Sequence, residues 1–190
     1  MKPRKSSDYV NSLARGLSVL DLLGREGIEL TLSQVAKQLN LDRATARRSL
    51  LTLKELGYVC SSDARRFQLT AKVLALGNAY LSSNGYWRDV QPILRRVRDS
   101  TGESVLVGIL DGTEFLCTAA AKSRNLVGIE LSVGSRLPAH CTSIGQVLLS
   151  GCSDDELDCY FSNVDLTRYT SKTITKPDAL SEVVPVVWTV

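Results

Sequence analysis

The chain has 190 residues, of which 44% are hydrophobic and 23% charged, an ordinary composition for a soluble globular protein. No apolar run approaches the ~18 residues that span a bilayer, and no signal-peptide core follows the basic first residues, so we expect a cytoplasmic protein. The net charge of +3 is uneven: residues 1–80 hold 13 Lys/Arg against 7 Asp/Glu (net +6), and residues 81–190 hold 10 against 13 (net −3). This asymmetry is expected when only the first part meets phosphate.

The first predicted helix runs from Val10 to Leu23. Its apolar side is expected to consist of leucines at periods of three and four, namely Leu13, Leu17, Leu20 and Leu23. Arg15, on the opposite side, is a candidate phosphate contact.

Two further helices and a hairpin are predicted between Thr31 and Leu69. A capping box at Thr31–Gln34 begins one helix, whose apolar face consists of Val35, Ala36 and Leu39. Asp42 is a good N-cap for the next helix, which begins at Arg43, places Leu50, Leu53 and Leu56 on one stripe, and stops at Gly57. Tyr58–Cys60 and Arg66–Leu69 follow as short strands. This order of elements is the winged helix-turn-helix arrangement, which lays its second helix in the DNA major groove.

The candidate DNA-binding residues gather at the second helix and the hairpin: Ser33, Arg43, Thr45, Arg47, Arg48, Arg65 and Arg66. Arg43 and Thr45 lie in the first helical turn, where side chains reach base edges or flanking phosphate. Arg47 and Arg48 either read guanine through a bidentate contact or neutralise phosphate. Ser33, Arg65 and Arg66 are better suited to phosphate. Ala44 and Ala46 either approach thymine methyl groups or simply allow close packing. The alternative is that these arginines form a solvent-exposed face with no role in binding.

A fourth helix is predicted from Thr70, an N-cap candidate, to Leu81. Its apolar side is marked by Val73, Leu76 and Tyr80, and the run Ser82–Gly85 is the expected domain boundary. Two interpretations stay open, because this apolar side either contacts a second copy of the chain or caps the wing.

The second part opens with an amphipathic helix from Trp87 to Thr101, in which Val90, Ile93, Leu94 and Val97 form the buried stripe. The pattern then predicts strands at Ser104–Leu110, Glu114–Ala119 and Asn125–Leu131, a loop at Gly134–Ala139 and a helix that begins at Ser143. Asp111-Gly112 is a strong hairpin signal between the first two strands. We therefore expect an α+β fold with an N-terminal winged helix-turn-helix, a linker helix and a C-terminal α/β domain.

The five cysteines are odd in number and include no C-x-x-C pair, so neither a disulfide framework nor a metal site is expected, and no cofactor is implied. Cys141 beside His140 raises the possibility of a thiol nucleophile with its base. Neighbouring side chains of an extended segment point to opposite faces, however, and no other acid or base converges on them. The sequence therefore predicts no enzyme.

Several motifs together resemble the IclR family of bacterial transcriptional regulators: Asn11–Leu20, Leu30–Ala36, Glu55–Val59, Val133–His140 and Ser143–Gly145. Ala46–Gly57 and Leu76–Ser83 are similar to the branch that regulates the β-ketoadipate pathway, in which protocatechuate and 4-hydroxybenzoate are degraded. The resemblance implies a winged helix-turn-helix DNA-binding domain at residues 9–70, a linker helix at 71–85 and an effector-binding domain at 86–190. It also implies dimers that pair through the DNA-binding parts, and often tetramers.

The resemblance further implies a cup that holds a small organic acid, with Leu126, Ile129, Ser143 and Ile144 as the effector-binding residues. Backbone N–H groups at a helix start attract a carboxylate, and the two apolar side chains would cover its carbon skeleton. Ser143 would look the same if it were only a helix cap. Arg136 and His140 either bind the effector or anchor a loop.

Family effector domains continue beyond the stretch that corresponds to Leu180, whereas Ser181–Val190 does not resemble that continuation. We therefore expect an effector domain shortened at its C-terminus, with an unpaired sheet edge. The function implied is a DNA-binding transcriptional regulator of aromatic-acid catabolism, gated by a small carboxylate effector. The alternative is a protein-interaction or dimerisation module that uses its winged helix without specific DNA binding.

Overall fold

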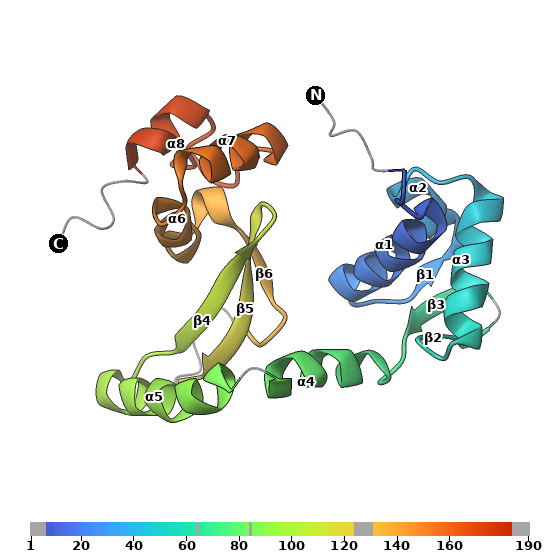
Figure 1. Ribbon diagram of the computed structural model, residues 1–190, viewed down its shortest axis with the longest axis horizontal. Helices are drawn as coiled ribbons and strands as arrows, with labels where there is room; N and C mark the ends of the chain where they lie inside the picture. Colours follow the sequence, from blue (N-terminus) through green and yellow to red (C-terminus); the bar gives the residue numbers. More distant parts are fainter. Residues whose placement is uncertain (1–6, 64, 84, 124–130, 184–190) are drawn as a thin grey trace. The chain divides into compact units, whose positions relative to one another are not determined.

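The computed structural model describes residues 7–63, 65–83, 85–123 and 131–183, without the side chains of Tyr86, Trp87 and Val183. The chain divides into two compact units, Met1–Asn84 and Gly85–Val190. Each unit combines helices with a small antiparallel sheet (Figure 1), which confirms the predicted mixture of helix and sheet with a helix-turn-helix at the N-terminus.

Within its described residues, the first unit contains four helices and three strands. They are α1 (Asn11–Glu26), β1 (Leu30–Thr31), α2 (Leu32–Gln38), α3 (Arg43–Glu55), β2 (Val59–Ser61), β3 (Arg66–Leu69) and α4 (Val73–Ser83).

The predicted start and stop signals of α2 and α3 are confirmed. The Thr31 hydroxyl accepts the N–H of Gln34 at 3.3 Å while Gln34 Oε1 accepts the N–H of Thr31 at 2.8 Å, which is a complete capping box. Asp42 Oδ1 accepts the N–H of Thr45 at 2.8 Å and so caps α3. After α3 the backbone turns at Gly57, whose φ of 79° lies in the left-handed region that favours glycine.

The hairpin belongs to a sheet of three strands in the order β1-β3-β2. Leu30 pairs with Phe67 and Val59 with Leu69, so β3 is the central strand. The sequence pattern predicts the hairpin but not β1, because a strand of two residues leaves no periodic signal and is defined only by its distant partner.

The core of the first unit lies between α1, α2, α3 and the sheet. Its buried side chains are Val19, Leu22, Leu23, Leu30, Val35, Ala46, Leu50, Leu53, Val59 and Phe67. The stripe predicted for α1 was partly wrong, because Leu13 is 61% and Leu17 57% exposed while Val19 and Leu22 take the buried positions. Leu56, expected beside Leu50 and Leu53, is also exposed.

Helix α4 buries none of its side chains within the first unit, and Leu76 is 58% exposed. The chain reaches α4 through Thr70, whose hydroxyl donates to the Gly57 carbonyl at 2.6 Å and accepts the N–H of Lys72 at 3.2 Å. The helix begins at Val73, two residues after Ala71, which would be its first residue if Thr70 were the N-cap.

The second unit contains α5 (Tyr86–Thr101), β4 (Val105–Asp111), β5 (Glu114–Ala121), β6 (Arg136–Pro138), a 3-10 turn (Ala139–Cys141), α6 (Ser143–Ser150), α7 (Asp154–Asn163) and α8 (Pro177–Val183). Val90 and Leu94 of α5 are buried as predicted, whereas Ile93 and Val97 are exposed. The hairpin between β4 and β5 turns at Gly112 as predicted, with Asp111 opposite Glu114.

Two strand predictions have different outcomes. The strand expected at Asn125–Leu131 lies almost entirely at residues 124–130, outside the described residues. The loop expected at Gly134–Ala139 was wrong in part, because Arg136–Pro138 pairs with β5 as strand β6, with Leu137 opposite Phe115. Three residues are too few for a period, and only the pairing partner makes them a strand.

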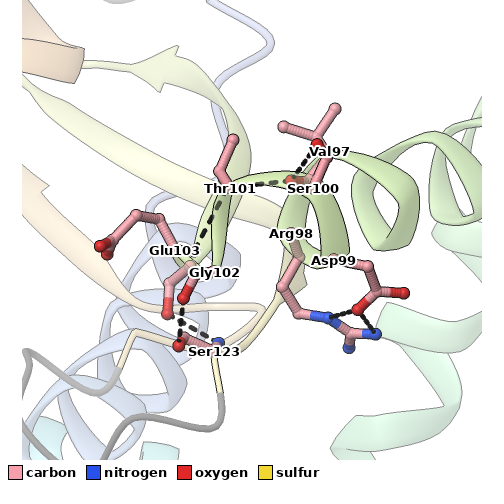
Figure 2. A network of polar contacts seen from close by, with 9 residues as sticks. Val97, Arg98, Asp99, Ser100, Thr101, Gly102, Glu103 and Ser123 are labelled. Atoms are coloured by element: carbon pink, nitrogen blue, oxygen red, sulfur yellow. Dashed lines mark hydrogen bonds and ion pairs between the residues drawn. The ribbon is translucent and has the colours of Figure 1, made fainter.

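Hydrogen bonds join the end of α5 to the end of β5 (Figure 2). Ser123 donates its hydroxyl to the Gly102 carbonyl at 2.6 Å and its N–H to Ser104 Oγ at 3.0 Å. The Thr101 hydroxyl donates to the Val97 carbonyl at 2.9 Å. The contact at Gly102 satisfies a carbonyl that a helix leaves without a partner at its C-terminus.

Candidate nucleic-acid interface and effector site

Four of the candidate DNA-binding residues lie around one hollow in the first unit. This basic hollow is formed by the start of α2, one face of α3 and the sheet, and its lining residues are Thr31, Leu32, Ser33, Arg43, Arg47, Leu51, Lys54, Ser61, Arg65 and Phe67. Ser33, Arg43, Arg47 and Arg65 are therefore brought together from three separate segments of the chain. Three arginine or lysine side chains come from α3 and one from the hairpin, so the surface is suited to a polyanion.

Thr45 and Arg48 do not line the basic hollow. The Arg48 guanidinium donates from Nη2 to Thr45 Oγ1 at 3.1 Å, and both residues line a different groove beside α1. Hydrogen bonds from the hydroxyl and the N–H of Thr45 lower the pKa of Asp42 below its usual value. Thr45 is itself buried, so the expectation that its side chain reaches base edges does not agree with this position.

The period of helix α3 explains why Thr45 and Arg48 do not line the basic hollow. Each residue of α3 turns the side chain by ~100° about the axis, so Arg43, Arg47, Leu51 and Lys54 share one side while Thr45 and Arg48 point to another. The same geometry separates the two alanines. Ala46 is fully buried, so of the two interpretations its position favours close packing. Ala44 is exposed.

The two wing arginines have different surroundings. Arg65 lines the basic hollow, whereas the exposed Arg66 does not belong to its lining and pairs through its backbone with Thr31 of β1. Both backbone N–H groups donate to Asp63 Oδ1, at 3.0 Å from Arg65 and 2.9 Å from Arg66.

Sequence reasoning missed six lining residues of the basic hollow, namely Leu51, Lys54, Thr31, Leu32, Ser61 and Phe67. The first two could have been found, since they follow Arg47 at helical spacings of four and seven. Leu51 is 41% exposed among cations. An apolar side chain there can contact the methyl group of thymine, which hydrogen-bonding side chains cannot read.

The other side of the first unit carries an apolar groove. It is lined by Ser12, Leu13, Arg15, Gly16, Leu17, Leu20, Thr45, Arg48, Ser49, Thr52, Leu53, Leu56, Tyr58 and Leu76. The exposed leucines of α1, α3 and α4 thus gather on one surface instead of being scattered. Arg15, a candidate phosphate contact by sequence, lies at this groove and not in the basic hollow. Exposed apolar surface of this kind is found at protein-protein and membrane contacts and in ligand-binding grooves.

The candidate effector residues are only partly described. Leu126 and Ile129 lie outside the described residues. Ser143 is exposed at the first position of α6, and Ile144 beside it is half-buried. The cap of α6 is Thr142, whose hydroxyl accepts the N–H of Gly145 at 3.3 Å, so the interpretation of Ser143 as the cap was wrong.

Close packing fixes the start of α6. A Cβ at Gly145 would lie 2.3 Å from the Cα of Ala139, so only glycine allows this approach. Gln146 adds a hydrogen bond from Nε2 to the His140 carbonyl at 3.1 Å. The backbone at the first turn of α6 is therefore held in place from two sides.

Arg136 and His140 act as anchors within the second unit. Arg136 contacts the carboxylates of Asp111 and Glu114 at the hairpin turn. His140 is buried, and its Nε2 lies 3.0 Å from the carbonyl oxygen of Thr167. Of the two interpretations left open by the sequence, these contacts favour the anchoring of loops.

Cys141 is not arranged as a nucleophile. It lies in a 3-10 turn, so the premise of an extended segment was wrong, and its thiol donates to the Pro138 carbonyl at 3.9 Å. Burial raises the pKa of the Cys141 thiol, which disfavours the reactive thiolate. Within the described ranges no group of His, Cys, Asp and Glu could hold a metal ion, and no helix could span a membrane.

Comparisons with known proteins identify both units. Residues 12–61 match the model of the IclR helix-turn-helix domain, and residues 78–187 match that of the bacterial transcriptional regulator IclR C-terminal domain. The Pca regulon regulatory protein of Pseudomonas putida is 41% identical over 91% of this chain and 60% of its own length. The p-hydroxybenzoate hydroxylase transcriptional activator of Acinetobacter baylyi is 34% identical over 90% of this chain and 65% of its own length. The chain thus spans less than two thirds of the length of these relatives.

Solved structures agree on the fold. A transcriptional regulator from Rhodococcus sp. RHA1 is 44% identical, with a TM-score of 0.67 over 94% of this chain and 71% of its own. An IclR homologue from Microbacterium hydrocarbonoxydans, solved in complex with 4-hydroxybenzoate, is 24% identical, with a TM-score of 0.68 over 92% of this chain and 72% of its own. At that identity the second likeness concerns the fold alone.

Proposed function

Because this chain belongs to the IclR family of bacterial transcriptional regulators, we propose that it is a sequence-specific DNA-binding regulator of aromatic-acid catabolism, gated by a small organic acid. Residues 9–70 would be the DNA-binding domain, 71–85 the linker helix and 86–190 the effector-binding domain. Binding to operator DNA requires that the protein act in the cytoplasm.

One observation carries this proposal: cationic side chains from α3 and the wing converge on the basic hollow. When α3 lies in the major groove, Arg43 and Arg47 reach base edges or phosphates from its first two turns. Ser33 at the start of α2 and Arg65 on the wing contact the backbone on either side. Arg66 is exposed beside the hollow and adds positive charge.

The names of the relatives support the class of effector. They are regulators of the Pca regulon and of p-hydroxybenzoate hydroxylase, both concerned with aromatic acids. We place the carboxylate at the first turn of α6, where Ser143 is exposed and Ile144 is half-buried. The N–H groups of a first helical turn have no partner within the helix and favour an anion. Leu126 and Ile129 would contact the ring.

The apolar groove supports a homodimer formed through the first units, and a tetramer would be a pair of such dimers. Leu17 of α1 and Leu76 of α4 are both more than half exposed there, and association of two copies would remove them from water. The two-fold symmetry of a dimer matches the paired half-sites of an operator.

A fluorescence-anisotropy titration of labelled duplexes, selected by the protein from a random pool, tests the function. The logarithm of the affinity should fall steeply and linearly with the logarithm of salt concentration, because each phosphate contact releases counterions. Addition of protocatechuate or 4-hydroxybenzoate should change the affinity. Absence of binding at low salt would instead favour a module that recognises protein through the apolar groove.

A further inference from the structure

The turn of the wing is closed by one carboxylate. Asp63 Oδ1 accepts the backbone N–H groups of both Arg65 and Arg66, at 3.0 and 2.9 Å. These two hydrogen bonds lower the pKa of Asp63 below its usual value. The carboxylate therefore stays charged at neutral pH and holds the backbone where β3 begins.

A second contact ties the same turn to the neighbouring strand. Ser62 donates its hydroxyl to Glu29 Oε1 at 3.1 Å, just before β1, and Arg66 pairs with Thr31 of β1. The wing backbone is thus held both by the Asp63 carboxylate and by its contacts with Glu29 and strand β1. Arg65, whose N–H is bound to Asp63, is the wing arginine that lines the basic hollow.

The charge of Asp63 opposes the proposed function, since an exposed carboxylate beside a phosphate-binding surface repels DNA. Its two hydrogen bonds act in the opposite direction, because they restrict the wing backbone before DNA arrives. A cation whose backbone is held in the bound conformation loses less conformational freedom on binding. The two effects predict opposite outcomes when the carboxylate is removed, which makes them separable.

We propose that Asp63 is a positioning residue, which orients the wing arginines Arg65 and Arg66 toward the DNA backbone through its hydrogen bonds to their N–H groups. This inference rests on the proposed DNA-binding function. Asp63 itself makes no favourable contact with DNA.

Anisotropy titrations against salt, with Asp63→Ala, Asp63→Asn and the control Asp21→Ala, test the inference. Asp21 is an exposed carboxylate of α1 whose removal changes the net charge equally without touching the wing. We expect Asp63→Ala to bind more weakly, with a salt slope smaller by about one phosphate contact. The loss of that contact corresponds to a roughly eightfold lower affinity at ~0.1 M salt. Asp63→Asn keeps an acceptor oxygen without the charge, so it should bind as well as the parent or better.

A double variant shows whether the effect passes through the arginines. On an Arg65→Ala/Arg66→Ala background, Asp63→Ala should cause no further loss of affinity. Equal binding by Asp63→Ala and Asp21→Ala would overturn the inference, as would a further loss on the double-alanine background with an unchanged melting temperature. If the parent protein shows no salt-dependent binding at all, the proposed function itself fails, and that result is distinct from both.

Discussion

Adjacent arginines of one helix can serve different surfaces. Arg47 lines the basic hollow, while Arg48 binds the Thr45 hydroxyl at the apolar groove. Both carry the same charge, so composition cannot distinguish them. Their separation by ~100° about the helix axis does, because the two surfaces lie on different sides of α3.

Arg47→Ala and Arg48→Ala form a matched pair for operator binding. We expect Arg47→Ala to weaken binding to the selected duplex by ~1–3 kcal/mol, with a smaller loss on random DNA, if Arg47 reads a base. Arg48→Ala should change DNA affinity less and affect self-association more. Anisotropy on selected and random duplexes measures both, and equal losses for the two variants would show that only their charge matters.

Tyr160 connects burial with stability at alkaline pH. It lies on α7 in the core formed with Leu149 and Leu180, and its ring meets that of Phe161 edge-on at 5.6 Å between centroids. Burial raises the pKa of Tyr160 to about 12, since the phenolate would be charged in an apolar surrounding.

The stability that depends on the neutral phenol of Tyr160 should be fully present below the ordinary pKa of 10 and lost as the pH rises through about 12. Between these values the unfolded chain releases a proton that the folded chain keeps. Urea unfolding followed from pH 9 to 12 should show a steeper decline in the parent than in Tyr160→Phe, which cannot ionise. Parallel declines would contradict this assignment.

At the scale of elements, the helix-turn-helix is specified by local contacts. The capping box at Thr31 and the Asp42 cap each join residues three apart, and Gly57 ends α3 through its own backbone conformation. Strands β1 and β6 behave differently, because Leu30 and Arg136 become strand residues only by pairing with Phe67 and Leu116. Such short strands cannot be predicted from their own sequence.

Helix α4 and the first turns of α1 form the apolar groove instead of contributing to the core. Leu76 and Leu74 are both exposed residues of α4, at 58% and 70%, but only Leu76 lines the groove. The two side chains differ in their direction about the axis of α4. Substitution of each therefore provides a matched test of the proposed dimer.

Leu76→Glu should weaken self-association while Leu74→Glu should leave it nearly unchanged. Burial of one leucine contributes ~1.5–3 kcal/mol, and a symmetric dimer carries the change twice, so the loss corresponds to at least roughly a 100-fold weaker dimer, and a buried charge weakens it further. Sedimentation velocity over a range of concentrations measures the effect. A dimer that tolerates Leu76→Glu would place the interface elsewhere.

At the scale of the whole molecule, net charge differs between the two units, since residues 1–80 are basic and residues 81–190 are acidic. The basic hollow and the apolar groove both belong to the first unit, on different sides of α3. In a dimer, this arrangement leaves the cationic surface free while the leucines are covered. Positive charge in residues 1–80 and negative charge in residues 81–190 favour approach of DNA to the first unit only.

The sequence alone determined the helix-turn-helix, the wing hairpin and the resemblance to a family, because caps, turns and motifs depend on residues close together in the chain. It also supplied Arg43, Arg47 and Arg65 as candidates for one surface. Only the tertiary structure decided that Thr45 and Arg48 face another surface, and that Leu13 and Leu17 stay exposed while Val19 and Leu22 are buried. A helical pattern allows several overlapping stripes, and the packing partners select which of them becomes the core.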